Sequence, residues 1–541
     1  MVNNIEHLPG LGKSDHEILK FKFNCYLETK ENNMNKFIYS KGNFTNMTNE
    51  LSLINWQEVL HEDVQCSWIS FTEIIIKSAE NNIPKCKVET SKHRNPYVDR
   101  QAVEAIKEKR RKWKKYQYCK NHLTYEEYKH SRNNVNYELR RARYQHEERV
   151  ALNSKENSKG FWKFVRRNTK TRISTSPLEM PNGDVTESDH EIADTLNRHF
   201  TSVFTDENLA NIPNFVLDQH YTELKDLPIT EEVITSALKS VNPSKTVGPD
   251  HIHPKIIKEC SEIMIQPLKL IFNKSIEEGK LPQEWKEANV TAIFKAGSRK
   301  KAENYRPISI TSICCRIMER LIRNVIVEHL ESNNILSSQQ HGFRQGFSCT
   351  TQLLECMEDW TQSIDEGKQV DVIYLDFKAA FDKVPHQRLL KKIWGYGIQG
   401  QVYKWIESFL SNRKQRVLVN GQQSDWAPVR SGVPQGSVLG PVLFLMHIND
   451  LPEVIQCVTR LFADDTKIYQ EITNQMDGQK LQDDIFNACT WLQKWQLLFN
   501  IKKCKSMHLG KQESDKYYIK DYNNKIHEIS EVQSEKDLGV H

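Results

Sequence analysis

The alternation of apolar and polar positions from Gln369 to Asp382 predicts a buried strand that ends in a carboxylate. In QVDVIYL, apolar residues fall on both alternating sets of positions, as in a strand covered on both faces. Asp376 follows at the end of this strand, and a helical pattern begins at Lys378. An acid at the end of a central strand can hold a metal rigidly, but Asp is also a common turn residue. The segment alone therefore leaves both interpretations open.

Helical patterns dominate the N-terminal half of the chain. Residues 97–159 contain neither Pro nor Gly and are rich in strong helix formers. An apolar stripe at helical spacing covers 187–204. Further helices are expected at 231–240, 256–278, 313–330 and 438–446. The pattern therefore predicts a mainly helical region in front of a part that mixes strands and helices.

Paired acids occupy the tip of a second predicted element, the hairpin from Val458 to Tyr469. Its tip is Ala463-Asp464-Asp465, and adjacent carboxylates repel each other unless a cation lies between them. The same dipeptide at Asp483-Asp484 lies in a helical pattern that we expect to be exposed. If the hairpin pairs with the strand before Asp376, the acids converge. They would then bind two hard divalent cations, best matched by Mg²⁺ with Mn²⁺ as an alternative, as in phosphoryl transfer.

Two further segments carry groups suited to a nucleotide. The strand pattern EANVTAIFK ends in Lys295, and Arg306 follows a polar turn, so both cations would suit a triphosphate; a plain surface hairpin is the alternative. In SGVPQGSVLGPVLF, glycines recur every four residues around Gln435. Glycine permits close approach of the backbone to a ligand, and Gln435 can hydrogen-bond a nucleotide or a template backbone.

The charge of the chain is unevenly distributed. The 541 residues carry a net charge of +5, yet the stretch from Lys92 to Arg149 contains 17 Lys or Arg and only 8 Asp or Glu. Aromatic residues alternate with these cations, which favours an RNA- or DNA-binding helical arm. A solvated helical hairpin with its aromatic residues packed inward is the alternative. The candidate contacts are Lys109, Arg110, Arg111, Lys112, Lys114 and Lys115.

Cysteine usage and apolar runs bear on the compartment. The 12 cysteines form no CxxC pair, which favours reduced thiols, an intracellular protein and no zinc finger. No apolar run has the length of a membrane span, and the first residues do not form a signal peptide, so no membrane partner is expected. Nucleus and cytoplasm are not distinguished.

An ordered series of motifs then identifies a family. KTVGPDHIHPKII, NYRPISI, QHGFRQGFSCTTQL, YLDFKAAFDKV, SGVPQGSVLGP, LFADD, WLQKWQLLFNIKKCKSMHLG and KDLGV follow one another in this chain. The series resembles the reverse transcriptase of non-LTR retrotransposons of the jockey-like kind. The resemblance implies an α+β fold with the fingers and palm of a right-hand polymerase, an antiparallel sheet with packed helices. It assigns 229–541 to this domain and 25–228 to a mainly helical basic linker or nucleic-acid-binding region.

The resemblance also implies roles for single residues. Asp376 and Asp464 would ligate both Mg²⁺ ions with help from Asp465, and the backbone of Phe377 would face the metal. Lys295 and Arg306 would hold the incoming dNTP, with Gln435 and Gly436 in the loop beneath it. Phe381 falls where the family excludes ribonucleotides. Either Lys503 or Lys505 would donate a proton to pyrophosphate, and Asp382 would cap a turn.

Both ends of the chain resemble interrupted domains. Ser14-Asp15-His16 within residues 1–24 resembles the last motif of the endonuclease/exonuclease/phosphatase fold, although Ser14 with Glu17 also fits a helix cap. Ser188-Asp189-His190 repeats the pattern where a helix begins. We expect a nuclease remnant without activity at residues 1–24. The last residues, Leu538 to His541, lie where a helical thumb would follow, so the thumb is expected to be absent.

Three functions follow as hypotheses. The leading one is an RNA-directed DNA polymerase that extends a DNA primer on an RNA template. The second is a catalytically inactive nucleic-acid-binding remnant of such an element. The third, an RNA-templated RNA polymerase, is disfavoured because Phe381 would clash with a 2′-hydroxyl.

Overall fold

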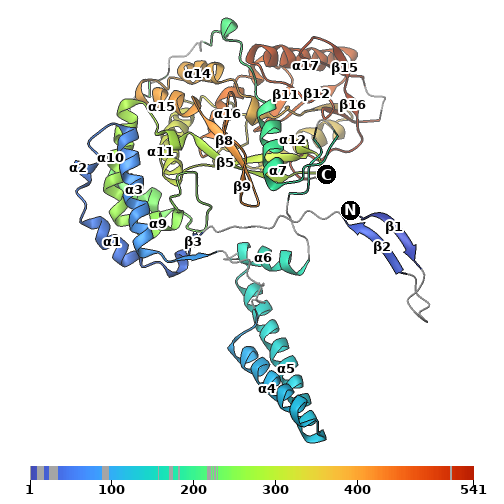
Figure 1. Cartoon of the computed structure of the whole chain (residues 1–541). Helices are drawn as coiled ribbons and strands as arrows, with labels where there is room; N and C mark the ends of the chain where they lie inside the picture. The colour runs from blue at the N-terminus through green and yellow to red at the C-terminus, as the bar shows by residue number, and fades with distance from the viewer. Residues whose placement is uncertain are drawn as a thin grey trace. The chain divides into compact units, whose positions relative to one another are not determined.

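The chain folds into two compact units, as seen in a computed structural model (Figure 1). The structure describes all residues except 1, 9–17, 24–34, 88–96, 156–157, 170–174, 181–182, 216–220, 222, 225–226, 228, 512–514 and 541. The larger unit holds residues 1–28, 38–84 and 175–541, and the smaller holds 29–37 and 85–174. The stretch 25–228, expected to be one linker, is thus divided between them. The fold is mixed α/β, with several sheets and many helices.

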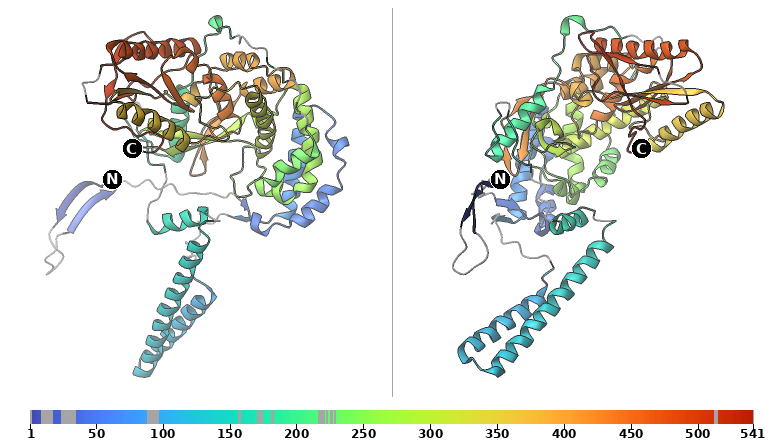
Figure 2. Two further views of the ribbon diagram at one scale, coloured as in Figure 1. Left: turned by 180° about the vertical axis from the view of Figure 1, so that it is seen from behind. Right: turned by 90° about the vertical axis from the view of Figure 1, so that its right-hand side faces the viewer.

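A five-stranded sheet around β7 (Gln369–Leu375) forms the centre of the larger unit. Its strand order is β11-β12-β7-β13-β16, where the other strands are β11 (Val458–Phe462), β12 (Asp465–Ile472), β13 (Lys505–Leu509) and β16 (Ser530–Glu531). β12 and β13 both pair antiparallel with β7, which confirms that β7 is a central strand. Helices α12 (Cys349–Asp365) and α17 (Gln475–Trp495) cover opposite faces of this sheet (Figures 1 and 2). On the α12 face, Cys356 and Trp360 pack against Val370, Val372 and Tyr469.

A second sheet is built around β5 (Glu287–Phe294), in the order β10-β8-β5-β6. Its other strands are β6 (Tyr305–Ile310), β8 (Lys414–Val419), β9 (Gln422–Gln423), which pairs with β8, and β10 (Ala427–Pro428). Helix α7 (Asp189–Ser202) packs on β8 and contributes Ile192, Leu196 and Phe200 to the core. The Ser188 hydroxyl accepts a hydrogen bond from Glu191 N at 3.1 Å, which confirms the helix start predicted there.

Residues 38–84 belong to the core of the larger unit. They form α1 (Phe44–Ser52), α2 (Trp56–Val59) and α3 (Val64–Asn82), and α3 packs on α10 (Ser261–Glu278). The buried Trp68 ring meets Trp285 edge-on at 5.1 Å, and Val64 N donates to Glu278 at 3.0 Å. The sequence pattern showed weak helices here but not this packing.

The smaller unit is mainly a helical hairpin of α4 (Arg100–Cys119) and α5 (His122–Leu152), followed by α6 (Ser158–Asn168). Asp99 and Asn121 cap the two long helices by accepting bonds from Ala102 N and Thr124 N. The hairpin confirms the helices predicted within residues 97–159, over Arg100–Cys119 and His122–Leu152. A short pair, β3 (Asn35–Phe37) and β4 (Lys85–Lys87), lies in the same unit.

The remaining helices are α8 (Glu231–Lys239), α9 (Pro254–Glu259), α11 (Ile313–Ser332), α13 (Ala380–Lys383), α14 (His386–Gly395), α15 (Gly400–Leu410) and α16 (Gly440–Ile448). Short 3₁₀ turns occur at Tyr39–Lys41, Leu209–Asn211, Gln283–Trp285, Ala302–Asn304 and Pro452–Val454. The remaining strands pair as β1 (Val2–Leu8) with β2 (Ile18–Phe23) and β14 (Tyr518–Lys520) with β15 (Ile526–Glu528). No helix among the described residues has both the length and the apolar character needed to cross a membrane. Ser14, Asp15 and His16 lie outside the described residues.

Candidate active site

The register of the β7 sheet brings Asp376 and Asp465 together. Thr466 pairs with Leu375, so the next position along each strand sets Asp465 beside Asp376. Asp465 itself pairs with Phe462 of β11, which leaves Ala463 and Asp464 as the two-residue turn between β11 and β12. The predicted hairpin is confirmed, and its strand β12 is the neighbour of β7.

The charges of neighbouring carboxylates raise the pKa values of Asp464 and Asp465. Burial, then the charges of Asp464 and Asp376, raise the pKa of Asp465 to about 6. Burial and the Asp376 charge also raise the pKa of Asp464, while Arg306 and Lys295 act in the opposite direction. Like charges held together in a partly desolvated site favour a bound cation over three free carboxylates. The side chains are therefore of the kind and charge that suit a divalent metal.

A lysine on the other side of β7 reaches the same carboxylate. Lys505 pairs with Tyr374, so the register sets Lys503 beside Asp376, and Lys503 Nζ lies 3.4 Å from both Asp376 oxygens. Asp376 Oδ2 is buried and accepts no hydrogen bond. Within the described residues, no group of three or more His, Cys, Asp or Glu side chains is arranged tightly enough to hold a metal. The Asp376 oxygen without a hydrogen bond and the mutual repulsion of the carboxylates nevertheless match the needs of a cation.

The backbone of Phe377 faces the acids rather than the lysine. Asn500 N donates to Asp376 O at 2.7 Å and Lys378 N donates to Leu498 O at 2.8 Å, on the β13 side. Phe377 lies between these two bonds, so its own peptide groups point to the β12 side. This is the orientation expected for a backbone ligand.

The predicted phosphate-binding cations and the carboxylates influence one another through their charges. Lys295 follows β5 and Arg306 lies in β6, where it pairs with Ile293. Burial lowers the pKa of Lys295, as do the nearby charges of Arg306 and Lys503. Asp382 and Asp376 act on Lys295 in the opposite direction, so the cations and both carboxylates share one electrostatic environment.

The glycine-rich loop, residues 431–440, is hydrogen-bonded to the segment that follows β7. Val433 N donates to Phe381 O and Gly432 N to Val384 O, each at 2.8 Å. A Cβ at Gly432 would lie 2.7 Å from the backbone of Asp382, so only glycine permits this approach. The Phe381 ring stacks on Phe444, with ring centres 4.5 Å apart.

Gln435 contacts Asp382 in this structure. Gln435 Nε2 donates to Asp382 Oδ2 at 3.0 Å, and Gln435 O accepts from Ser309 N at 2.7 Å. Burial raises the pKa of Asp382 to about 6 against the effects of Gln435, Lys295 and Arg306. Asp382 was expected to cap a turn; in this structure its carboxylate holds the Gln435 amide of the loop and lies under the influence of the Lys295 and Arg306 charges. Gly436 follows with its backbone at φ +113°, where a Cβ would meet Ser309 O at 2.6 Å.

A cavity of about 500 Å³ opens beside Asp376 and Asp465. Lys502, Lys503 and Lys505 line one side, and Glu535 to Gly539 line another. Asp537 there forms an ion pair with the buried Lys467 of β12. Sequence analysis gave no role to either residue, although Asp537 belongs to the KDLGV motif. Of the two candidate lysines, Lys503 is the one that contacts Asp376.

The cations of the arm belong to the smaller unit and differ in their partners. Lys112 and Lys115 both pair with Glu127, and Arg111 pairs with Glu108. No ion pair of Lys109, Arg110 or Lys114 is found among the described residues. Four of the aromatic rings meet between α4 and α5, namely Trp113, Tyr116, Tyr125 and Tyr128. Packed aromatic residues were the feature expected of a solvated hairpin.

Comparison with known proteins gives the class of this domain. Residues 298–539 match the family described as reverse transcriptase (RNA-dependent DNA polymerase). The match spans the acids, both cavity-lining segments and the glycine-rich loop. This part of the chain is therefore similar to reverse transcriptase domains, as the ordered motifs predicted.

The relatives are proteins of mobile elements. The chain is 29% identical over 359 residues to a probable RNA-directed DNA polymerase from transposon BS of Drosophila melanogaster, covering 63% of this chain and 40% of that protein. It is 26% identical over 360 residues to the RNA-directed DNA polymerase from mobile element jockey of the same fly, covering 64% and 39%. A Pol polyprotein from the type-1 retrotransposable element R2 of Popillia japonica is 27% identical over 227 residues, covering 41% and 30%. The matched part is thus at most 40% of each of these relatives.

Proposed function

We propose that the chain is an RNA-directed DNA polymerase of a non-LTR retrotransposon, with the β7 sheet as palm and the β5 sheet in the fingers. It joins dNTPs to the 3′-hydroxyl of a DNA primer along an RNA template. The observation that carries this proposal is the pairing of β12 with β7, which sets Asp465 beside Asp376.

Asp376, Asp464, Asp465 and the Phe377 backbone are the groups that would hold two Mg²⁺ or Mn²⁺ ions. Bound there, such ions supply a lowered pKa for the primer hydroxyl and charge stabilisation for the leaving oxygen. Lys503 lies within reach of the same place and would give a proton to the pyrophosphate. Its 3.4 Å contact with Asp376 supports Lys503 over Lys505 for this role.

The nucleotide would lie between the cations and the glycine-rich loop. Lys295 and Arg306 would bind its phosphates, and the lowering effect of both charges on the pKa of Asp464 supports this. Gln435 and Gly436 would lie beneath the bound nucleotide. Phe381 would bar ribonucleotides, because its ring, stacked on Phe444, cannot easily move away from a 2′-hydroxyl.

Primer extension tests the proposal. Oligo-dT is annealed to an RNA template and extended with dTTP and Mg²⁺, with Asp464→Asn as the control. Extension that is lost in the control supports the polymerase. Absence of extension by a folded protein that still binds the duplex would favour the second candidate, an inactive nucleic-acid-binding remnant.

We also propose that the helical arm binds nucleic acid through exposed cations. Lys109, Arg110 and Lys114 support this, because none is held by an ion pair among the described residues. The test compares two variants. In the triple variant, these three residues are changed to Gln. In the double variant, Lys112 and Lys115 are changed to Gln, and both of these lysines form ion pairs with Glu127. The triple variant should reduce the salt slope of RNA binding by about 3. An equal slope in both variants would assign the arm to a structural role.

Residues 1–24 are further proposed to be the tail of an endonuclease-like domain. Two features support this: the Ser14-Asp15-His16 motif and the strand β2 that follows it.

A further inference from the structure

The segment from Gln339 to Gly342 lies along the free edge of β11, and the QHGFRQG motif begins within it at Gln340. Leu461 N donates to Gln339 O at 2.9 Å, and His341 N donates to Leu461 O at 2.8 Å. Gln340 thereby forms a parallel bridge with Leu461. The segment extends the β7 sheet at the strand that leads into the acidic turn.

The Gln340 side chain reaches the turn itself. Gln340 is 2% exposed, and its Oε1 accepts hydrogen bonds from Ala463 N at 2.9 Å and Gly342 N at 2.7 Å. Ala463 is the residue immediately before Asp464. A buried amide oxygen with two backbone donors fixes both strands of backbone relative to each other.

The turn needs such a support because its backbone is strained. Ala463 has φ +56°, a conformation that costs a non-glycine residue of order 1 kcal/mol. Gly342 lies so close that a Cβ there would be 2.3 Å from Ala463 N. No side chain in the described part of the chain donates a hydrogen bond to the Asp464 carboxylate, so the turn backbone determines where that carboxylate lies.

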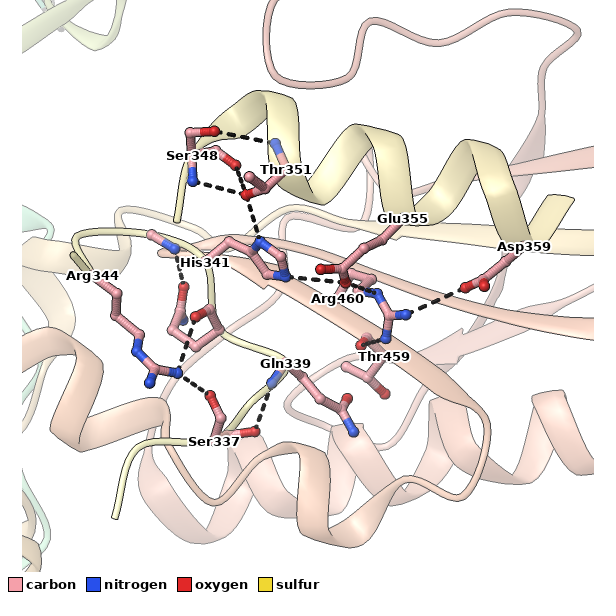
Figure 3. A network of polar contacts seen from close by, with 12 residues as sticks. Ser337, Gln339, His341, Arg344, Ser348, Thr351, Glu355, Asp359, Thr459 and Arg460 are labelled. Atoms are coloured by element: carbon pink, nitrogen blue, oxygen red, sulfur yellow. Dashed lines mark hydrogen bonds and ion pairs between the residues drawn. The ribbon is translucent and has the colours of Figure 1, made fainter. Parts of the chain in front are cut away.

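The segment is in turn anchored to α12 through His341 (Figure 3). The buried His341 ring contacts Thr351 Oγ1 at 3.1 Å through Nδ1 and Glu355 Oε2 at 3.3 Å through Nε2. Glu355 also pairs with Arg460 of β11 at 3.2 Å, and Arg460 continues to Asp359 at 3.3 Å. The support of the turn is thus fixed to a helix and to β11 at once.

We propose that Gln340 is a positioning residue that holds the Ala463 turn so that Asp464 faces Asp376. The proposal rests on the polymerase function proposed above. Loss of the Oε1 acceptor would release the Ala463 amide and let the turn relax, which displaces Asp464. Displacement of a catalytic group by about 1 Å can cost roughly 100-fold in rate.

The experiment compares three variants with a matched control. Gln340→Met removes the acceptor at nearly constant volume, and Gln340→Asn is one carbon too short to reach Ala463. Gln340→Glu keeps an acceptor oxygen. The control is Gln339→Met, because the neighbouring Gln339 Oε1 accepts no hydrogen bond.

Hydrogen exchange provides the readout that does not depend on activity. In Gln340→Met and Gln340→Asn, the Ala463 amide should exchange about tenfold faster, while Gln340→Glu and the control match the wild type. Unchanged exchange of the Ala463 amide in both Gln340→Met and Gln340→Asn would overturn the proposed role of Gln340. This holds even if one of them folds poorly, because the second variant reports independently.

Single-nucleotide extension provides the catalytic readout. Gln340→Met should lower kcat by roughly 10- to 100-fold with the KM for dTTP within about twofold, and Gln340→Glu should recover most of the loss. A wild type that extends no primer would overturn the proposed function and the role of Gln340 with it. An active wild type whose Gln340→Met variant equals the control in kcat would overturn the positioning role alone.

Discussion

Two Asp-Asp dipeptides occur in this chain, and their surroundings are opposite. Asp464 and Asp465 lie at the β11–β12 turn, where burial and one another's charge raise the pKa of Asp465 to about 6. Asp484 in α17 is 1% exposed, but its Oδ2 accepts bonds from Gln456 N at 2.9 Å and Cys457 N at 2.7 Å. Among the described residues, no other residue donates a hydrogen bond to the side chain of Asp464 or Asp465, whereas Asp484 of the second pair accepts two backbone N–H groups.

The difference separates a carboxylate that can bind a cation from one that supports the fold. A carboxylate with two backbone donors is stabilised where it is and has no need of a metal. We expected Asp483-Asp484 to be exposed; this holds for Asp483 and is wrong for Asp484. Helical periodicity places Asp484 on the same side of α17 as Leu481, Ile485 and Ala488, all of which are buried.

The largest expected effect is that of Asp464→Asn. Loss of this charge should reduce nucleotide incorporation by roughly 1000-fold, or about 4 kcal/mol. Because burial and Asp376 disfavour the charged form of Asp464, the same change should raise the thermal midpoint. The extension assay measures the loss of incorporation, and calorimetry measures the rise of the thermal midpoint. A lower midpoint would show that Asp464 supports the fold as Asp484 does.

Asp484→Leu should show the reverse pattern. Two buried backbone N–H groups lose their acceptor, which should lower the free energy of unfolding by about 3 kcal/mol. Incorporation per folded molecule should be unchanged, because Asp484 has no place in the candidate site. Urea unfolding measures the first quantity and active-site titration the second.

Asp483→Asn is the matched control for the helix. Among the described residues, its exposed carboxylate accepts a hydrogen bond only from Gln479 Nε2, one turn earlier, at 2.8 Å. The change should alter stability by no more than about 0.5 kcal/mol. If Asp483→Asn lowered the free energy of unfolding as much as Asp484→Leu, burial would not explain the difference between the two residues.

Local patterns predicted the elements that carry the site. The double-sided apolar run of QVDVIYL identified β7 as central, and the acids between the two apolar runs identified the β11–β12 turn. Ser188 and Thr230 begin their helices as expected, with side-chain acceptors for Glu191 N and Val233 N. These features depend on neighbours within a few positions, which a single sequence displays.

Contacts between distant segments could not be predicted in the same way. Gln340 reaches Ala463 across 123 positions, and Gln435 reaches Asp382 across 53. Nothing local distinguishes Gln340 from Gln339, since both precede the same His-Gly pair. In the arm, composition showed the cations and rings but not that Trp113 packs on Tyr128 or that Glu127 holds Lys112.

Asp382 is intermediate between the carboxylates of the acidic turn and Asp484, and its raised pKa predicts that the stability of the fold depends on pH. Among the described residues its carboxylate has one side-chain donor, Gln435 Nε2, and its pKa is about 6 in the fold against an ordinary value of 3.8. The folded state therefore holds a proton that the unfolded chain releases between pH 4 and pH 6, so stability falls as the pH rises through this window. Asp382→Asn removes the dependence, and its free energy of unfolding relative to the wild type should grow by about 2 kcal/mol from pH 4 to pH 7. Urea unfolding at several pH values measures this difference. A constant difference would mean that Lys295 and Arg306 compensate the burial of Asp382 in full, and that the carboxylate belongs with Asp484 rather than with the acidic turn.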